Sequence, residues 1–229
     1  MQGSEKTAPP GQQWRQDMPR FGLPRFAKRV VSSKPGQGID IAGLSAVPFN
    51  ATAAMIDALP QITMSADFHC VTTWSVAGVT WQGVSFKALY DALLATQDTP
   101  VTGLGFAAVH AHDEYRASFH LADLLQDNAL LAVEMPNAKI STKHGVPFRL
   151  VMPDQYGYKN VKNVKRIEFL PDLRSYGHRG CGLWSIRARV AHEERARGIP
   201  GVLLRWPYRG MIRDTVATFE HEWHQNGGH

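Results

Sequence analysis

The sequence predicts an α+β fold in which mixed β-sheets carry flanking helices. Short runs rich in Val, Ile, Thr and aromatic residues recur through residues 39–170, and each run has the length of a strand. Other segments place apolar residues at helical spacing, which is typical of helices that pack against a sheet. We expect the strands to form more than one sheet.

Length and composition fit one domain with extensions. The chain has 229 residues, of which 44% are hydrophobic and 20% are charged, as in an ordinary globular protein. The net charge of +5 admits an anionic cofactor, an acidic substrate or nucleic acid. Lys and Arg are scattered without a long basic run, so nucleic-acid binding is the weaker hypothesis and we expect no nucleic-acid partner.

Three parts of the chain differ in composition. Residues 1–38 are rich in Pro, Gly, Gln and basic residues, and we expect an extended N-terminal arm. Residues 39–170 hold the predicted strands and form the main domain. Residues 171–229 begin with a Gly-containing connector and continue as a helical C-terminal extension.

The first elements lie between residues 39 and 79. Residues 39–44 alternate and predict a strand. Residues 49–59 predict a helix, with Asn50 as its N-cap and Pro60 as its stop. Residues 63–79 are rich in Thr, Val and Trp and predict β-structure, which places Cys70 on a strand or loop.

A second helix is defined by its cap and its apolar face. Ser85 is the expected N-cap. Apolar residues then follow at i, i+3, i+4, i+7 and i+8, at Phe86, Leu89, Tyr90, Leu93 and Leu94.

The rest of the chain predicts four strands and three helices. The strands are expected at residues 105–112, 129–135, 148–152 and 164–170, with a short helix at 120–126 between the first two. Residues 186–197 predict a highly charged helix that stops at Gly198. A last helix is indicated by the spacing of Ile212, Val216, Phe219 and Trp223.

The cysteines and the termini limit the class of protein. Two cysteines, Cys70 and Cys181, are too few for a disulfide framework. A single bridge between them is possible, but metal ligation by the Cys70 thiolate would exclude it. The first residues carry neither an apolar stretch nor a twin arginine, so we expect a cytoplasmic protein unless a leader precedes this sequence. No apolar run is long enough to predict a membrane span.

Two segments carry the chemistry. The first, residues 67–75, contains Cys70, whose thiolate would be a ligand for soft metals. The second, residues 144–153, leads into the basic segment 156–162, whose Lys, Arg and backbone N–H groups suit a phosphate. For an isolated cysteine the simpler interpretation is a small buried hydrophobe. Together the segments suit a protein that holds a soft metal at one end of an anionic cofactor.

These segments resemble the sulfite-oxidase superfamily of molybdopterin enzymes. The resemblance is carried by Cys-Val-Thr-x-Trp-Ser followed by Trp-x-Gly-Val, and by His-Gly-x-Pro-x-Arg-Leu-Val-x-Pro followed by Tyr-Gly-x-Lys-x-Val-Lys. It covers about residues 39–170. It implies the molybdopterin-binding fold of that superfamily, with a molybdenum–molybdopterin cofactor.

The resemblance implies a role for each matching residue. Cys70 would bind molybdenum through its thiolate and would be the catalytic residue, while the dithiolene of the cofactor supplies two more sulfurs. His144 and Arg149 would contact the pterin and its phosphate. A turn histidine and a surface arginine at a strand edge are the simpler interpretations of these two residues.

A basic turn completes the implied cofactor site. Asn160, Val161 and Lys162 match the phosphate-and-pterin turn of the superfamily, where Lys162 would supply a point charge and the other two backbone groups. Lys159 and Lys165 lie close by in sequence, and we expect one of these lysines to be only solvated.

A histidine pair offers a less specific signal. His110 and His112 lie two apart on a predicted strand, so both side chains should face one side. That spacing can bind Zn or Fe, but no third ligand is obvious beyond Asp113 and His120. The superfamily places a pterin-contacting residue near His110, so His110 is a cofactor-binding candidate and His112 is left unassigned.

The residues after Cys70 bear on the substrate. Sulfite oxidases carry Arg shortly after the ligating Cys, whereas Val71, Thr72, Thr73, Trp74 and Ser75 stand here. The expected pocket is less positive and more aromatic, and is closer to the bacterial branch typified by the protein-methionine-sulfoxide reductase catalytic subunit. We expect oxygen-atom transfer at S- or N-oxides, either small molecules or protein-bound.

The source of electrons is expected to be separate. The His-Pro-Gly-Gly motif of heme-carrying animal sulfite oxidases is absent, and the stretch after Leu170 is short for their dimerisation domain. Electrons would therefore pass through a separate electron-transfer protein. Two alternatives stay open, namely sulfite-oxidase-like oxidation and a metal-free binding module that retains the fold.

Overall fold

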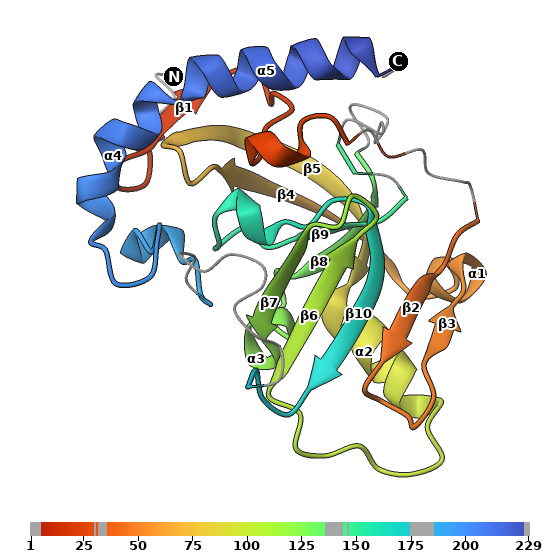
Figure 1. The fold of residues 1–229 in the computed structure, drawn as a ribbon. Coiled ribbons are helices and arrows are strands. Elements are labelled where there is room, and N and C mark those ends of the chain that lie inside the picture. The colour runs from red at the N-terminus through yellow and green to blue at the C-terminus, as the bar shows by residue number, and fades with distance from the viewer. Residues whose placement is uncertain are drawn as a thin grey trace, which may run out of the picture.

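The structure is a computed structural model that describes residues 6–29, 31, 36–135, 144–145, 147–174 and 186–226. Within these residues the chain forms two five-stranded sheets, and helices lie against their faces and edges (Figure 1). This is the α+β arrangement of mixed sheets that the sequence predicts. Cys181 lies outside the described residues.

The first sheet is built around β5 (Trp74–Ser85). This strand pairs antiparallel with β4 (Gln61–His69) and with β8 (Leu130–Glu134), and β8 pairs in turn with β9 (Arg149–Val151). From the N-terminal arm, β1 (Gln13–Arg15) adds a parallel strand at the start of β5. This part of the arm is therefore tied to the domain by strand pairing.

The second sheet has the order β3-β2-β10-β6-β7. These strands are, in the same order, Phe49–Ala51, Ile39–Ala42, Val164–Leu170, Phe106–Ala111 and Arg116–His120. β2 runs parallel to β10, and the other neighbours are antiparallel. The sequence analysis did not anticipate β7, which continues directly into the short helix α3 (Leu121–Leu124).

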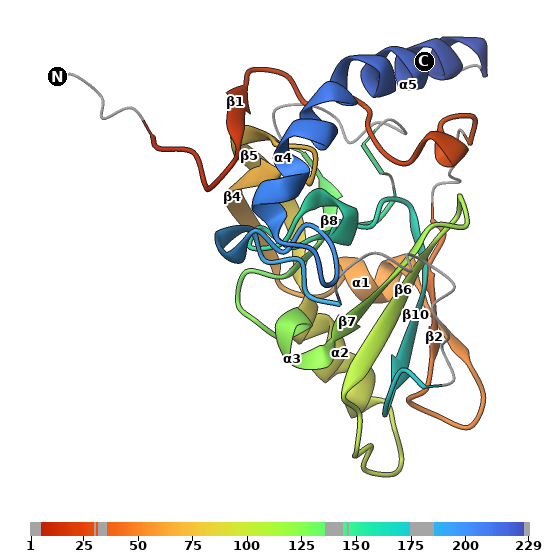
Figure 2. The same ribbon diagram turned by 60° about the vertical axis from the view of Figure 1, so that its left-hand side comes forward.

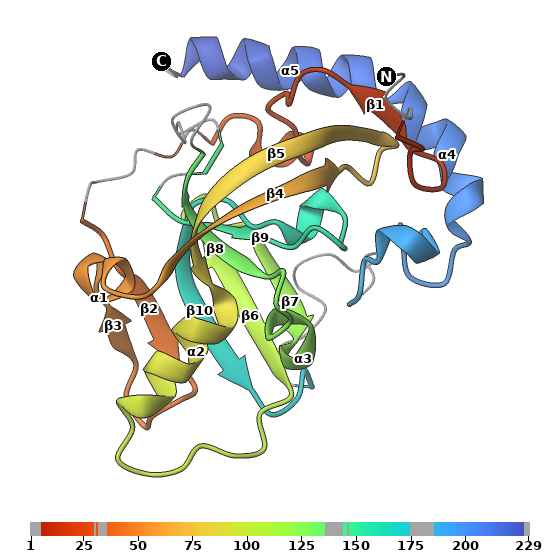
Figure 3. The same cartoon turned by 180° about the vertical axis from the view of Figure 1, so that it is seen from behind.

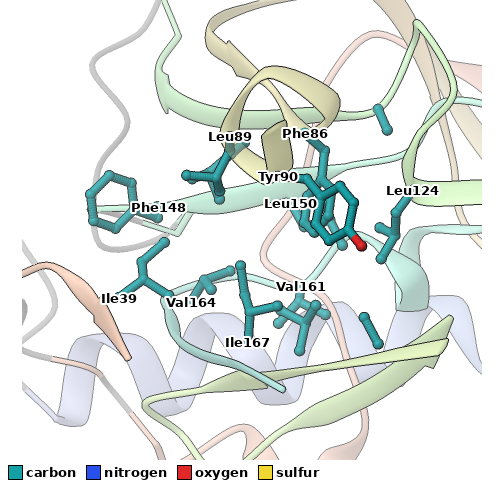
Figure 4. Packing of buried hydrophobic residues seen from close by; sticks show 14 of the residues in the cluster. Ile39, Phe86, Leu89, Tyr90, Leu124, Phe148, Leu150, Val161, Val164 and Ile167 are labelled. Atoms are coloured by element: carbon teal, nitrogen blue, oxygen red, sulfur yellow. The ribbon is translucent and has the colours of Figure 1, made fainter. Parts of the chain in front are cut away.

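The main hydrophobic core joins the two sheets through α2 (Phe86–Ala95), which lies across a face of the second sheet (Figures 3 and 4). Ser85 caps α2 as predicted, because its Oγ accepts a hydrogen bond from the Ala88 N–H at 3.1 Å. The ring of Tyr90 lies 5.2 Å from that of Phe169 on β10. The buried face of α2 thus fixes the helix on the sheet that it covers.

The segment expected to be a helix from residue 49 begins instead as a strand. β3 pairs with β2, and Asn50 Nδ2 donates a hydrogen bond to Asp40 Oδ1 at 2.9 Å rather than capping a helix. The N-cap is Thr52, whose Oγ1 accepts from Met55 N, and α1 covers only Ala53–Asp57. Strand pairing has overridden the helical pattern at the start of this segment.

The charged segment 186–197 is not the predicted helix. It contains a single 3-10 turn, η3 (Val190–His192). Its backbone bonds to the main domain instead of along a helix, as where the Tyr156 N–H donates to the Ala188 carbonyl at 2.9 Å. Because such long-range bonds use groups that a helix would need, the segment follows the surface of the domain.

Two helices complete the C-terminal extension, α4 (Gly201–Gly210) and α5 (Ile212–Gln225). The second was predicted and the first was not. Both lie along the edge of the first sheet, with β1 beneath them (Figures 1 and 3). None of the described helices is both long and apolar enough to cross a membrane.

Candidate active site

A cavity of about 260 Å³ lies beside Cys70. Its walls come from the β4–β5 turn, the loop after β9 with η2 (Gly157–Lys159), the N-terminal arm and the two C-terminal helices. Four residues of the predicted site line this cavity: Cys70, Arg149, Asn160 and Lys162.

A tight turn between β4 and β5 presents Cys70. The Cys70 N–H donates to the Trp74 carbonyl at 2.8 Å, and the Thr73 N–H donates to the Cys70 carbonyl at 3.2 Å. Thr73 adopts a φ of 77°, which is unusual for a residue other than glycine. From the arm, Gln12 Nε2 donates to the Cys70 carbonyl at 3.2 Å. The thiol is thus held on a turn whose backbone is bonded on both sides.

The thiol itself is buried but faces the cavity. Its Sγ lies 3.1 Å from Thr72 Oγ1. Burial raises the pKa of the Cys70 thiol to about 11, and the Thr72 hydrogen bonds only partly oppose this rise. A free thiol here is therefore protonated at neutral pH, and a soft metal that displaces the proton would make it a ligand.

Arg149, at the start of β9, is the most unusual charge in the cavity. Its side chain is fully buried, and its guanidinium lies 4.8 Å over the Trp81 ring and 5.4 Å over the Phe68 ring. Nη1 donates to the His144 carbonyl at 2.9 Å, while Nε has no hydrogen-bond partner among the described residues. Burial lowers its pKa to about 9. Within the described part of the chain, no carboxylate offsets this cost.

Lys162 lines the same cavity and adds to the positive potential. The pKa of Lys162 is lowered to about 7, mainly by burial and then by repulsion from Arg149 and Arg20, against the attraction of Asp113 and Cys70. Lys162 is half-buried and is attracted by Asp113, which also lines the cavity, whereas the fully buried Arg149 has no carboxylate partner among the described residues and is costly to bury unless an anion joins it. The electrostatics therefore favour a bound anionic group that reaches from the cations towards the thiol.

Asn160 and Val161 both follow η2 but do different things. Asn160 lines the cavity, and its Oδ1 accepts from the Met152 N–H at 2.9 Å, which ties the turn to the end of β9. Val161 packs into the main core, and its carbonyl accepts from the Leu150 N–H at 2.9 Å. In Figure 4 the Val161 side chain lies among core residues, and its backbone N–H and carbonyl are already hydrogen-bonded within the chain.

The two predicted histidines differ in their relation to the cavity. His144 adjoins it through the carbonyl that binds Arg149, and its side chain is not part of the lining. The structure does not bring His110 to the cavity. Strand alternation directs Val109 of β6 into the core and His110 to the other face, where Nε2 lies 3.5 Å from Glu168 Oε2. Among the described residues, no group of three or more His, Cys, Asp or Glu could hold a metal.

The remaining walls come from the two ends of the chain, and sequence reasoning did not place them here. Arg20 of the arm is buried and donates to the Phe219 carbonyl at 3.1 Å, while its guanidinium lies 5.3 Å over the Trp223 ring. Phe21 lies 6.5 Å from Phe219 in a stacked arrangement and 5.6 Å from Trp74 in an edge-on one. The apolar face of the last helix was the available signal, because such a face must pack against something.

A family model and several known proteins match this chain. The model described as "Oxidoreductase molybdopterin binding domain" matches residues 35–176, which is more than half of the chain. The chain is 28% identical over 131 residues to a Bacillus subtilis protein named "Uncharacterized oxidoreductase YuiH", covering 57% of this chain and 64% of that protein. It is 28% identical over 184 residues to the "Protein-methionine-sulfoxide reductase catalytic subunit MsrP" of Campylobacter jejuni, covering 70% and 62% respectively.

A solved structure supports the same fold. The sulfane dehydrogenase SoxCD of Paracoccus pantotrophus superposes with a TM-score of 0.52 at 20% identity, over 62% of this chain and 40% of that one. The chain spans less than two thirds of the length of each of these relatives. The matched region contains the Cys70 turn and the basic loop, and on these grounds the chain belongs to the oxidoreductase molybdopterin-binding domain family, within the sulfite-oxidase superfamily.

Proposed function

We propose that this chain is a molybdenum-cofactor-dependent oxidoreductase that transfers an oxygen atom from S- or N-oxides, with electrons from a separate protein. One observation carries the proposal: a buried thiol shares a cavity with a fully buried arginine that has no carboxylate partner among the described residues. A polyanionic cofactor with a metal at one end would satisfy both groups.

The residues of the cavity fit such a cofactor. Cys70 would bind the metal, and Arg149 and Lys162 would hold the phosphate or the pterin carbonyl. The buried Nε of Arg149 has no hydrogen-bond partner among the described residues, and an anionic oxygen would supply one. When bound, the cofactor supplies a redox centre that is able to exchange an oxygen atom.

The protein would orient the metal-binding sulfur, exclude water from the site and supply positive charge that binds the cofactor. The bonded turn around Cys70 holds the sulfur in one orientation, and the aromatic rings of Phe21 and Trp74 limit water on the open side. Arg149 and Lys162 would anchor the cofactor away from the reacting end. The Thr72 hydroxyl lies 3.1 Å from the Cys70 sulfur.

The wall beside the thiol favours a neutral oxide over sulfite. Trp74, Phe21 and Phe219 give this wall an apolar surface. An arginine from elsewhere in the chain could bind sulfite instead. Arg116, however, lies on β7 opposite His110 and does not line the cavity. Arg20 does line the cavity, but its guanidinium already donates to the backbone carbonyls of Ala27, Phe219 and Arg29. A dianion would therefore compete with the cofactor for Arg149 and Lys162, whereas an oxide with apolar substituents would not.

The relatives support the same substrate class and a partner. One is named a protein-methionine-sulfoxide reductase catalytic subunit, and another, from Azospira oryzae, a putative protein-methionine-sulfoxide reductase subunit. Names that describe subunits imply assemblies. We extend to this chain a sulfoxide substrate, free or within a protein, and a separate electron donor.

A viologen-coupled assay tests the proposal. Protein produced in a host that makes molybdopterin should reduce dimethyl sulfoxide, methionine sulfoxide or trimethylamine N-oxide, and should oxidise sulfite poorly. Cys70→Ser should abolish the activity, while Val47→Ala, at an exposed site away from the cavity, should keep it. Efficient sulfite oxidation without oxide reduction would reject the proposed substrate class.

A further inference from the structure

α4 presents an apolar stripe to solvent. Ile199, just before the helix, and Val202, Leu203 and Trp206 within it follow at i, i+3, i+4 and i+7, and are 39%, 51%, 65% and 81% exposed. This spacing places Val202, Leu203 and Trp206 on one face of the helix, and the exposed Ile199 directly precedes it. Such a stripe normally packs into a core, but here it points outward. Figure 1 shows α4 at the left-hand edge of the molecule, and in Figure 2 the same helix lies in front of β4 and β5.

The opposite face of α4 is fixed to the domain. Gly201 is buried so close to Glu193 that a Cβ would lie 2.1 Å from the Glu193 carbonyl oxygen. Arg205 donates to Glu193 Oε1 at 2.9 Å, and Tyr208 lines the cavity. The orientation of the helix is therefore set by these contacts, and the stripe cannot turn inward without breaking them.

The stripe lies within a purely basic stretch of sequence. From Arg195 to Arg213 the chain contains five arginines and no carboxylate. Glu193 pairs with Arg195 and Arg205, whereas Arg197, Arg209 and Arg213 have no ion pair with a carboxylate among the described residues. Arg197 and Arg213 are exposed. A partner for this surface must be apolar where it meets the stripe and negative around it.

We propose that α4 lies on an anionic lipid surface, with the stripe in the headgroup region and the arginines against the phosphates. Trp and Leu on one face and Arg beside them are the composition of helices that lie in a membrane interface. Trp206 is more exposed than any other large apolar residue described. A protein partner would need a groove shaped to it, whereas lipid adapts to a protruding side chain. Binding of this kind is peripheral and needs no spanning helix.

The position of α4 links such docking to the cavity. Met211, which follows α4, is 47% exposed and also lines the cavity, and Arg209 Nε lies 3.5 Å from Thr73 Oγ1 in the Cys70 turn. A membrane under α4 would therefore lie beside the turn that carries Cys70. The proposal concerns binding alone and does not depend on the reaction proposed above.

Co-sedimentation with vesicles tests whether α4 lies on an anionic lipid surface. The whole protein should bind vesicles of phosphatidylcholine with phosphatidylglycerol, should bind pure phosphatidylcholine weakly, and should be released by salt. Leu203→Ala with Trp206→Ala should weaken binding by about tenfold or more. Arg197→Gln and Arg213→Gln should each weaken it by about fivefold. Val47→Ala and Arg174→Gln, at exposed sites elsewhere, are matched controls that should bind as the parent does.

Tryptophan fluorescence gives a second readout that does not need activity. Trp206 emission should shift to shorter wavelength with anionic vesicles, and Trp206→Phe should lose the shift while keeping most of the binding. Circular dichroism of each variant confirms that it is folded. The proposal is overturned if the parent protein does not bind anionic vesicles, or if the Leu203/Trp206 double variant binds them as well as the parent does. Concentration-dependent dimerisation that the double variant abolishes also overturns it, because the stripe would then join two copies of the chain.

Discussion

The guanidinium of Arg195 donates a hydrogen bond to the carbonyl oxygen of Val71, the residue that follows Cys70. Arg195 is almost fully buried, and its guanidinium lies 4.9 Å over the ring of Tyr156. It belongs to the C-terminal extension, beyond residues 35–176 that match the family model. The extension of this chain therefore supports the turn that presents the thiol.

Replacing Arg195 with Ala should destabilise the protein. The change leaves the Val71 carbonyl without this donor and removes one of the two arginines paired with Glu193. Glu193 keeps Arg205 as a partner, so the loss of the hydrogen bonds to Val71 and Glu193 should cost about 1.5–3 kcal/mol. Urea unfolding measures the effect, and Arg189→Ala, whose pair with Glu194 lies nearer the surface, should lower the free energy of unfolding much less. If both variants lost the same small amount of unfolding free energy, Arg195 would not support the turn.

Acid should weaken the same region through Glu193. The hydrogen bond from Arg205 lowers the pKa of Glu193 below its usual value of 4.5, burial opposes this, and Arg195 lowers it again. A carboxyl with a depressed folded pKa stabilises the fold above its unfolded pKa, and this stabilisation is lost as pH falls through the folded pKa. Glu193→Gln should be less stable at neutral pH by about 1.5–3 kcal/mol, with a flatter acid profile. If the free energy of unfolding fell with pH in the same way for the wild type and Glu193→Gln, Glu193 would not be the source of the acid sensitivity.

Arg149→Met should separate cofactor binding from folding. In protein without cofactor, the buried arginine has no carboxylate partner among the described residues, so a methionine should leave the unfolding free energy unchanged or raise it by about 1–4 kcal/mol. The same variant should purify with much less pterin from a competent host. Pterin fluorescence after release and thermal unfolding measure the two effects, with exposed Arg174→Ala as the control. Full pterin loading would place the cofactor elsewhere.

Gly157→Ala should disturb the cavity through Phe68. A Cβ at residue 157 would lie 2.4 Å from Phe68 Cζ, and Phe68 lies under the Arg149 guanidinium. The ring must move, which should cost about 1–3 kcal/mol and reduce pterin content. Gly210→Ala meets no atom within 4 Å and should be neutral or slightly stabilising. If the two variants had the same stability and the same pterin content, the close approach of Gly157 to Phe68 would not matter for the cavity.

Local signals in the sequence predicted the elements that depend on them. Ser85 with the apolar face of α2 is one case, and the single thiol on a turn between strands is another. The prediction of a helix at residues 186–197 was wrong because the backbone of this segment bonds to residues far away in sequence, which composition does not reveal. His110 lies away from the cavity, because a sequence motif gives the position along a strand and not the face of the sheet that the side chain occupies. The arm and α5 reach the cavity only through tertiary packing, as Arg20 does.

Molybdenum K-edge X-ray absorption on purified protein tests the central claim most directly, because it counts the sulfur atoms bound to the metal. The wild-type protein should contain molybdenum with a sulfur from Cys70 in addition to those of the cofactor. Cys70→Ser, which keeps the fold and the cations Arg149 and Lys162, should have one sulfur fewer or no metal. Wild-type protein without molybdenum after production in a competent host, or an unchanged sulfur count in Cys70→Ser, would contradict the account.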